Sequence, residues 1–149
     1  MIEMKHIAML IAERAALKSN CDKRKVAFVV FNDSKIITVG VNQHAADKPC
    51  QCVAGIHDPD VTHAEAAIND EWFPESKAVL TYAPCYGCAI EVATSGIDTL
   101  FVKQVKHMAG INHLNKQGIA TQHEWLTENQ RIQAAWLLKW VYRQYEEYL

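Results

Sequence analysis

Two short segments of the sequence hold side chains that bind metal ions. The first reads His63-Ala64-Glu65, and the second reads Pro84-Cys85-Tyr86-Gly87-Cys88. A Cys-x-x-Cys pair on the first turn of a helix brings two sulfurs within reach of one ion, and the helix N-terminus favours the thiolate forms. With His63 as a third ligand, the set matches catalytic zinc, which keeps its fourth position for water. The spacing therefore predicts a zinc centre held by His63, Cys85 and Cys88.

Glu65 follows His63 by two residues, so its carboxylate can face the metal-bound water without being a ligand. Zinc lowers the pKa of such a water toward ~7, and a nearby carboxylate can move the protons. The pair H-x-E and P-C-x-x-C is typical of zinc deaminases that attack C4 of cytosine or C6 of adenine. Taken alone, Thr62 and Glu65 could form a capping box at a helix start. The two cysteines alone could form a redox pair or half of a structural zinc site. The combination favours the deaminase.

The elements that position these segments follow from apolar periodicity and turn residues. We expect helices over 4–19, 62–69, 85–95, 106–117 and 125–149, and strands over 26–31, 35–41, 78–82, 99–103 and 119–121. Pro84 suits the first turn of a helix, whereas Gly96 and Gly118 suit a helix end. Strands alternating with helices after a hairpin indicate an α/β layered domain, and the length fits a single domain over 1–149.

Composition narrows the class of ligand and the cellular location. Lys and Arg number 15 against 17 for Asp and Glu, and the net charge of −2 argues against a polynucleotide partner, which usually calls for a basic excess. The apolar stretch 7–12 is short and precedes Glu13 and Arg14, whereas a membrane span needs ~20 apolar residues. We therefore expect no membrane partner, no signal peptide and a cytoplasmic location (the host cytoplasm if a phage encodes the chain), where cysteines stay reduced.

With these residues in view, the chain resembles the cytidine and deoxycytidylate deaminase superfamily over 26–102. The run Pro84-Cys85-Tyr86-Gly87-Cys88-Ala89, followed by Ser95-Gly96-Ile97, is most similar to the deoxycytidylate (dCMP) deaminases, cellular and phage. The resemblance implies a three-layer α/β/α fold around a five-stranded mixed sheet, closed here by a long C-terminal helix. It also implies hydrolysis of dCMP to dUMP and ammonia, which supplies dUMP for dTMP synthesis.

The resemblance also assigns roles to single residues. It implies that His63, Cys85 and Cys88 hold the catalytic zinc, and that Glu65 protonates N3 and delivers a proton to the leaving amine. The residues implied to contact substrate are Ala64 at the base, Asn42 at the sugar, Tyr82 as a wall of the pocket, and Arg24 and Lys25 at the phosphate. Basic residues before a strand are also commonly just solvated, which is the alternative for Arg24 and Lys25.

The family binds dCTP as an activator and dTTP as an inhibitor through a G-Y-N-G strand end. Here that segment reads Gly40-Val41-Asn42-Gln43, so Val41 and Gln43 depart from the pattern. Regulation by dCTP and dTTP, with Mg²⁺ on their phosphates, is therefore left open. For the substrate, dCMP is the first expectation, and dCTP or both nucleotides are the alternative. A cytidine deaminase, or one acting on tRNA or single-stranded DNA, is less favoured.

A second metal site is a separate hypothesis. Some phage relatives hold a structural zinc with a Cys after the first helix, a Cys in the long loop and a His before the His-x-Glu segment. The matching side chains here are Cys21, Cys50, Cys52 and His57, which could close a tetrahedral site. Three reduced thiols and a surface imidazole are the alternative.

The C-terminal segment carries apolar residues at helical spacing: Ile132, Trp136, Leu137, Trp140, Val141 and Tyr145. We expect this stripe to cover the core of the domain. A subunit interface is the second interpretation, because exposed apolar patches of that size are uncommon on monomers. It would agree with the homo-oligomer, best guessed as a hexamer, that the resemblance implies.

Overall fold

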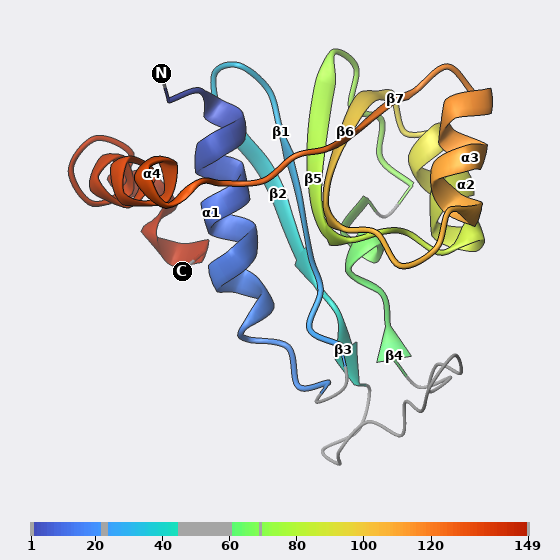
Figure 1. The fold of residues 1–149 in the computed structure, drawn as a ribbon, viewed down its shortest axis with the longest axis horizontal. Coiled ribbons are helices and arrows are strands. Elements are labelled where there is room, and N and C mark those ends of the chain that lie inside the picture. The colour runs from blue at the N-terminus through green and yellow to red at the C-terminus, as the bar shows by residue number, and fades with distance from the viewer. Residues whose placement is uncertain (1, 22–23, 45–60, 69, 149) are drawn as a thin grey trace.

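The computed structural model describes residues 2–21, 24–44, 61–68 and 70–148. A five-stranded mixed sheet forms its centre, with the strands in the order β2-β1-β5-β6-β7 (Figure 1). One face is covered by α1 (Met4–Ala16), with α4 (Glu128–Trp140) packed on α1. The other face is covered by α2 (Tyr86–Ala93), α3 (Ala109–Lys116) and the short 3-10 helix η1 (Ala64–Ile68). The structure therefore confirms the three-layer α/β/α fold.

The sheet begins with the predicted hairpin of β1 (Ala27–Phe31) and β2 (Ile36–Val41). Its turn is closed by the Asn32 Oδ1, which accepts hydrogen bonds from the backbone N–H of Ser34 at 2.8 Å and of Lys35 at 2.9 Å. β5 (Ser76–Tyr82) pairs antiparallel with β1, whereas β6 (Ile97–Gln104) and β7 (Ala120–His123) continue the sheet in parallel. A separate pair joins β3 (Gln43–His44) and β4 (Val61–Thr62).

Parallel pairing brings the carboxyl ends of β5 and β6 to the same edge of the sheet. The backbone N–H of Ala83, just after β5, donates to the Gln104 carbonyl at the end of β6 at 2.8 Å. Ligand sites in open α/β sheets form at such strand ends. The segment that follows β5 holds the Cys-x-x-Cys pair, so the topology places it at this edge.

Apolar side chains fill both faces of the inner strand β1, all of whose residues are buried. Val29 and Phe31 pack toward α1, whereas Phe28 and Val30 pack toward the layer of α2 and α3. This explains why the strand reads as a continuous apolar run rather than an alternating one. In the described ranges, no helix is both long and apolar enough to cross a lipid bilayer.

The predicted helix over 125–149 is shorter in the structure. α4 starts at a capping box formed by Thr127 and Gln130 and ends at Trp140, where the Leu137 carbonyl accepts from the N–H of both Val141 and Tyr142. The chain then turns into the 3-10 helix η2 (Arg143–Tyr148). This turn buries Tyr145, whose hydroxyl accepts from the Ile36 N–H at 3.2 Å. A continuous helix would lose that contact.

The expectation that the C-terminal stripe covers the core is wrong for most of its members. Ala134 and Leu138 face α1 and are buried, whereas Ile132, Trp136 and Trp140 are each more than half exposed. The apolar stripe and the packed stripe of α4 are therefore different faces. The second interpretation of this apolar face, a subunit interface, stays a prediction.

Candidate active site

The two cysteines lie at the start of α2, directly after β5. Cys85 is the N-cap residue of α2, with extended φ and ψ, and Cys88 is its third residue. The Ala89 N–H donates to the Cys85 carbonyl at 3.0 Å, which fixes the first turn. Gly110 of α3 lies directly against the Pro84 carbonyl, where an added methyl group would overlap it. The end of β5, the start of α2 and the close contact between α3 and Pro84 therefore fix the positions of both sulfurs.

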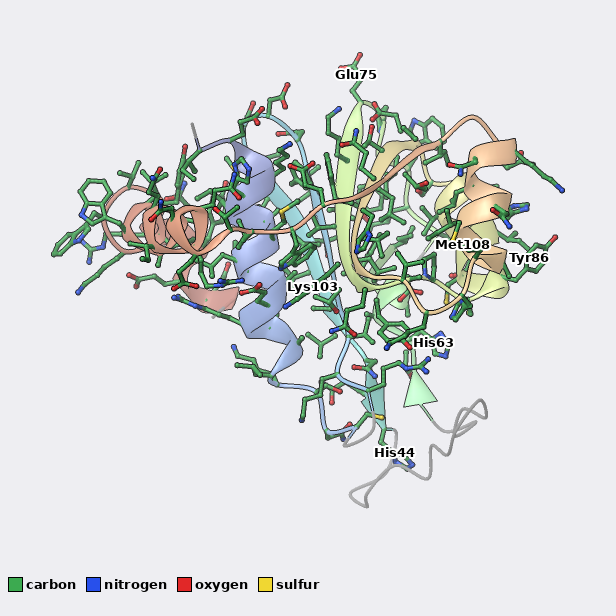
Figure 2. The ribbon with its side chains drawn as sticks, in the orientation of Figure 1. His44, His63, Glu75, Tyr86, Lys103 and Met108 are labelled. Atoms are coloured by element: carbon green, nitrogen blue, oxygen red, sulfur yellow. The ribbon has the colours of Figure 1, made fainter. Side chains whose placement is uncertain are left out.

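His63 directly precedes η1, and Glu65 is the second residue of η1. This short 3-10 helix packs on β2 and replaces the longer α-helix expected over 62–69. Gly40 of β2 makes this approach possible, because a methyl group there would overlap the Ala64 carbonyl oxygen and crowd the Ala67 side chain. Figure 2 shows His63 at the end of the molecule where β4 joins the layer of α2 and α3. The His-x-Glu segment therefore lies on the η1 side of the site, and the cysteines lie on the α2 side.

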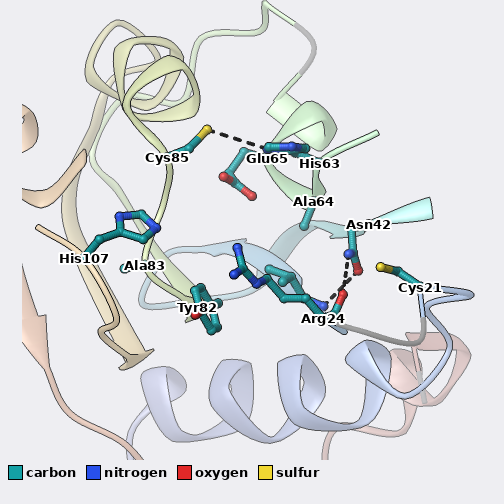
Figure 3. Close-up of a pocket in the computed structure, with 11 residues that line it drawn as sticks. Cys21, Arg24, Asn42, His63, Ala64, Glu65, Tyr82, Ala83, Cys85 and His107 are labelled. Carbon is teal, nitrogen blue, oxygen red and sulfur yellow. Dashed lines mark hydrogen bonds between the residues drawn. The ribbon is translucent and has the colours of Figure 1, made fainter. Parts of the chain in front are cut away.

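His63, Cys85 and Cys88 form a group whose ligand atoms all lie within 4.8 Å of one another. The His63 Nδ1 is 3.2 Å from the Cys88 Sγ. It is 3.7 Å from the Cys85 Sγ, the contact that Figure 3 marks with a dashed line. Tetrahedral zinc with ordinary Zn–S and Zn–N bonds requires a separation of about 3.6 Å between such atoms. The two distances lie on either side of this value, so the three side chains are close enough together to bind one metal ion.

Glu65 lies beside this group and is 4% exposed. Burial raises the pKa of the Glu65 carboxyl, and its interaction with the Cys88 thiol opposes that rise. Burial also raises the pKa of the Cys88 thiol, as does the adjacent Glu65 carboxylate. The carboxyl thus faces the cysteines, which favours a role in the site over the capping-box alternative. A divalent cation would offset the cost of holding these anionic groups away from water.

A pocket of about 470 Å³, counted to its open mouth, lies in front of this group. Its walls come from the segment before β1, the end of β2, η1, the end of β5 and the segment after β6. They comprise Cys21, Arg24, Val26, Asn42, His63, Ala64, Glu65, Tyr82, Ala83, Cys85 and His107.

Arg24 and Tyr82 both line this pocket and contact each other. The Arg24 guanidinium stacks 4.2 Å from the centre of the Tyr82 ring, and Figure 3 shows the Arg24 side chain extending across the pocket above Tyr82. Lys25 is not in the pocket wall, and its Nζ donates to the Ser19 carbonyl at 2.6 Å. The structure therefore brings one of the two basic candidates to the site.

The Asn42 side chain lines the pocket but also holds the backbone beside it. Its Oδ1 accepts from the Val26 N–H at 2.8 Å, and its Nδ2 donates to the Arg24 carbonyl at 2.6 Å. Asn42 therefore fixes the segment that carries Arg24, a positioning role beyond the sugar contact that the sequence suggested.

Of the four side chains of the hypothetical second metal site, only Cys21 falls in the described ranges. Cys21 is buried, its N–H donates to the Ser19 Oγ at 3.1 Å, and its side chain reaches the pocket near Asn42 (Figure 3). Cys50, Cys52 and His57 lie outside the described residues. The second zinc stays a prediction.

Sequence reasoning did not single out His107. It follows β6 in a segment without a motif, and only the adjacency of the β5 and β6 ends brings it to the pocket. Its ring lies 6.4 Å from the Tyr82 ring, centre to centre.

Comparison with solved structures places this fold and site in a known class. The chain is 26% identical to the dCMP deaminase of the cyanophage S-TIM5, solved in complex with dCMP and dUMP, with a TM-score of 0.70 over 80% of this chain and 95% of that chain. The apo form of the same enzyme gives a TM-score of 0.64. No significant match to a curated protein sequence was found. The fold and the site thus define a deaminase of the cytidine deaminase superfamily.

The family follows from the sequence as a whole. Residues 2–141 match the model of the MafB19-like deaminase family, so the chain belongs to that family. A diaminohydroxyphosphoribosylaminopyrimidine deaminase/5-amino-6-(5-phosphoribosylamino)uracil reductase from Thermotoga maritima shares the fold. It is 21% identical, with a TM-score of 0.63 over 95% of this chain and 42% of that chain. The resemblance to the deaminase superfamily is confirmed.

Proposed function

We propose that this protein is a zinc-dependent dCMP deaminase, which hydrolyses dCMP to dUMP and ammonia and so supplies dUMP for dTMP synthesis. One observation carries the proposal: His63, Cys85 and Cys88, whose ligand atoms lie within 4.8 Å of one another, are grouped beside the buried Glu65 at the floor of a pocket. The likeness to the cyanophage enzyme solved with dCMP and dUMP supports the choice of substrate.

The proposed metal ligands are the His63 Nδ1 and the two thiolates. Zinc bound by three such ligands supplies Lewis acidity and a water of lowered pKa. The start of α2 contributes as well, because the helix dipole stabilises negative charge on Cys85 and Cys88. The deamination itself requires proton transfers, which fall to Glu65.

Glu65 is the proposed general acid and base. It takes one proton from the attacking water and passes it to N3 of the cytosine ring, while the oxygen bonds to C4. It then carries the remaining hydroxyl proton to the amine, the C4–N bond breaks, and ammonia leaves. The raised pKa of the Glu65 carboxyl suits this work, because a group that both accepts and donates protons acts best with a pKa near the working pH.

Other substrates of the same chemistry are alternatives. A dCTP or dual dCMP and dCTP deaminase would use the same floor of the pocket with more phosphate contacts. A cytidine deaminase would need no basic residue at the mouth. A tRNA or single-stranded DNA deaminase needs a basic groove with stacking aromatics, which the net charge of −2 does not favour.

We also propose that the enzyme works as a homo-oligomer in the cytoplasm, with a hexamer as the expected size. The exposed apolar face of α4, with Trp136 and Trp140, supports assembly. Regulation by dCTP and dTTP with Mg²⁺ stays an open hypothesis, because Val41 and Gln43 depart from the pattern that binds these nucleotides. Adding each triphosphate to the dCMP assay tests it directly.

A substrate panel tests the proposed activity. Purified zinc-loaded protein is assayed for ammonia release from cytosine, cytidine, deoxycytidine, dCMP and dCTP. We expect the highest kcat/KM with dCMP, and loss of more than ~10³-fold in Glu65→Gln with the zinc content retained. Reaction of free cytidine or a purine alone would overturn the substrate, and full activity of Glu65→Gln would overturn the mechanism.

A further inference from the structure

The mouth of the pocket carries two cationic or proton-donating side chains from distant segments. Arg24 precedes β1, and His107 follows β6, yet both line the pocket in front of Glu65. Tyr82 lies between them: the Arg24 guanidinium stacks on its ring at 4.2 Å, and the His107 ring lies 6.4 Å away at an angle of 53°. Figure 3 shows the guanidinium extending toward the side of the pocket on which His107 lies.

Charge is distributed unevenly along this pocket. Among the described lining residues, Glu65 is the one carboxylate, and it lies at the floor beside the cysteines. The mouth, by contrast, holds a guanidinium and an imidazole. A ligand that suits both ends is neutral where it meets Glu65 and anionic where it leaves the pocket, as a nucleoside phosphate is.

His107 is available for such a ligand. Its side chain is exposed, and its ring nitrogens form no hydrogen bond with any residue that the structure describes. The hydrogen bond between Ala83 and Gln104 ties the segment before His107 to the strand end that carries Tyr82. The His107 imidazole is therefore held near the Tyr82 ring, and its nitrogens are available to bind a ligand.

We propose that His107 is a specificity-determining residue that, together with Arg24, binds the 5′-phosphate of the nucleotide across the edge of the Tyr82 ring. The inference rests on the proposed nucleotide deaminase function and adds to it the residue that distinguishes a nucleotide from a nucleoside. Hydrogen bonds from charged groups to phosphate are short and strong, so each contact contributes measurably to selectivity.

Binding of products tests this proposal without relying on turnover. The Kd values of zinc-loaded protein for dUMP and for deoxyuridine are measured by calorimetry, and their ratio gives the phosphate preference. We expect His107→Ala to lower this preference about tenfold, Arg24→Gln to lower it at least as much, and His107→Arg to restore it. The same ratio is then read from kcat/KM for dCMP and deoxycytidine.

Lys106→Ala is the matched control, because Lys106 is exposed, adjacent in sequence and absent from the pocket wall. An equal loss in Lys106→Ala would show that net charge alone matters and would overturn the proposal. So would His107→Ala weakening dUMP and deoxyuridine equally, or weakening neither. A protein that deaminates none of the cytosine compounds but shows the His107-dependent preference for dUMP would overturn the proposed function and leave this phosphate site standing.

Discussion

Gly40 of β2 lies directly against the carbonyl oxygen of Ala64 in η1, and the two backbones approach so closely that no side chain fits between them. Ala64 stands between His63 and Glu65 in the sequence. Its contact with Gly40 therefore fixes how close the His63 and Glu65 side chains lie to the cysteines. The positions of His63, a proposed metal ligand, and of Glu65, the proposed proton carrier, thus depend on a residue in a different layer of the fold.

Replacing Gly40 by alanine should displace η1. The added methyl group would overlap the Ala64 oxygen, a backbone atom that cannot rotate away. Overpacking of this kind costs about 1–3 kcal/mol, and a shift near 1 Å at a catalytic group can lower the rate about 10²-fold. We expect Gly40→Ala to reduce both zinc content and deaminase activity. Gly87→Ala is the control, because open space surrounds that position on α2; equal activity of the two variants would contradict the role of Gly40.

Metal removal should abolish activity and lower stability together. The ligand group joins η1 to α2, so an ion bound there links two elements that otherwise meet through side-chain packing. Binding contributes about 4 kcal/mol when free zinc exceeds its Kd a thousandfold. Dialysis against a chelator should therefore lower the Tm, and zinc should restore both Tm and ammonia release. An unchanged Tm after chelation would contradict a metal ion that links η1 to α2.

Glu13 of α1 should be a major source of stability. Its carboxylate accepts from the Arg131 Nε at 2.9 Å and Nη2 at 2.8 Å, and from the Trp125 indole at 2.6 Å. The Glu13 side chain is only 15% exposed, so replacing one of its oxygens by an amide NH2 leaves a partly buried donor of its partners without an acceptor. We expect Glu13→Gln to lower the free energy of unfolding by about 2 kcal/mol in urea titrations.

Glu128 provides the matched comparison for Glu13. It also pairs with Arg131, at 2.9 Å, but its side chain is 77% exposed. Exposed ion pairs contribute little, so Glu128→Gln should change stability by less than about 0.5 kcal/mol. Equal effects of the two substitutions would mean that burial does not determine the strength of this network.

The same cluster predicts an acid limb in the stability profile. Burial alone would raise the pKa of Glu13, but the hydrogen bonds from Arg131 and Trp125 outweigh it and lower the pKa from 4.5 to about 2. The unfolded chain therefore takes up the proton first, so this contribution is complete above pH 4.5 and is lost as the pH falls toward 2. The stability difference between wild type and Glu13→Gln should shrink over that range; a constant difference would contradict the assignment.

The outward face of α4 should determine the oligomeric state. Trp136 is 58% exposed and lines a shallow apolar hollow with Ile2 and Ile132. We expect Trp136→Gln to yield smaller species in light scattering without loss of secondary structure. Trp72→Gln is the control, because Trp72 is 67% exposed at another site. Unchanged assembly in Trp136→Gln would remove α4 from the interface.

Much of the fold could be predicted because local signals agree with the tertiary structure. The run 26–31 is β1 apart from its first residue, and Gly96 and Gly118, with φ of 92° and 82°, lie just after α2 and α3 as expected. The grouping of His63 with Cys85 and Cys88 also agrees with the spacing argument, because each segment starts a helical turn beside a strand.

The features that the sequence did not reveal depend on contacts between distant segments. Whether the apolar stripe of α4 faces inward depends on which side α1 occupies, and the 3.6-residue period does not specify that. Tyr145 ends the terminal helix through a hydrogen bond to Ile36, more than a hundred residues away. His107 reaches the pocket only because β5 and β6 end side by side.

The contact between Tyr145 and Ile36 also protects the sheet. β2 is an outer strand, and an outer strand with unpaired N–H groups can recruit a strand from another molecule. The Tyr145 hydroxyl occupies one such N–H at the start of β2. The segment η2 therefore protects the edge strand β2 from pairing with another molecule. A protein truncated after Val141 should form intermolecular β-structure more readily than the full-length chain.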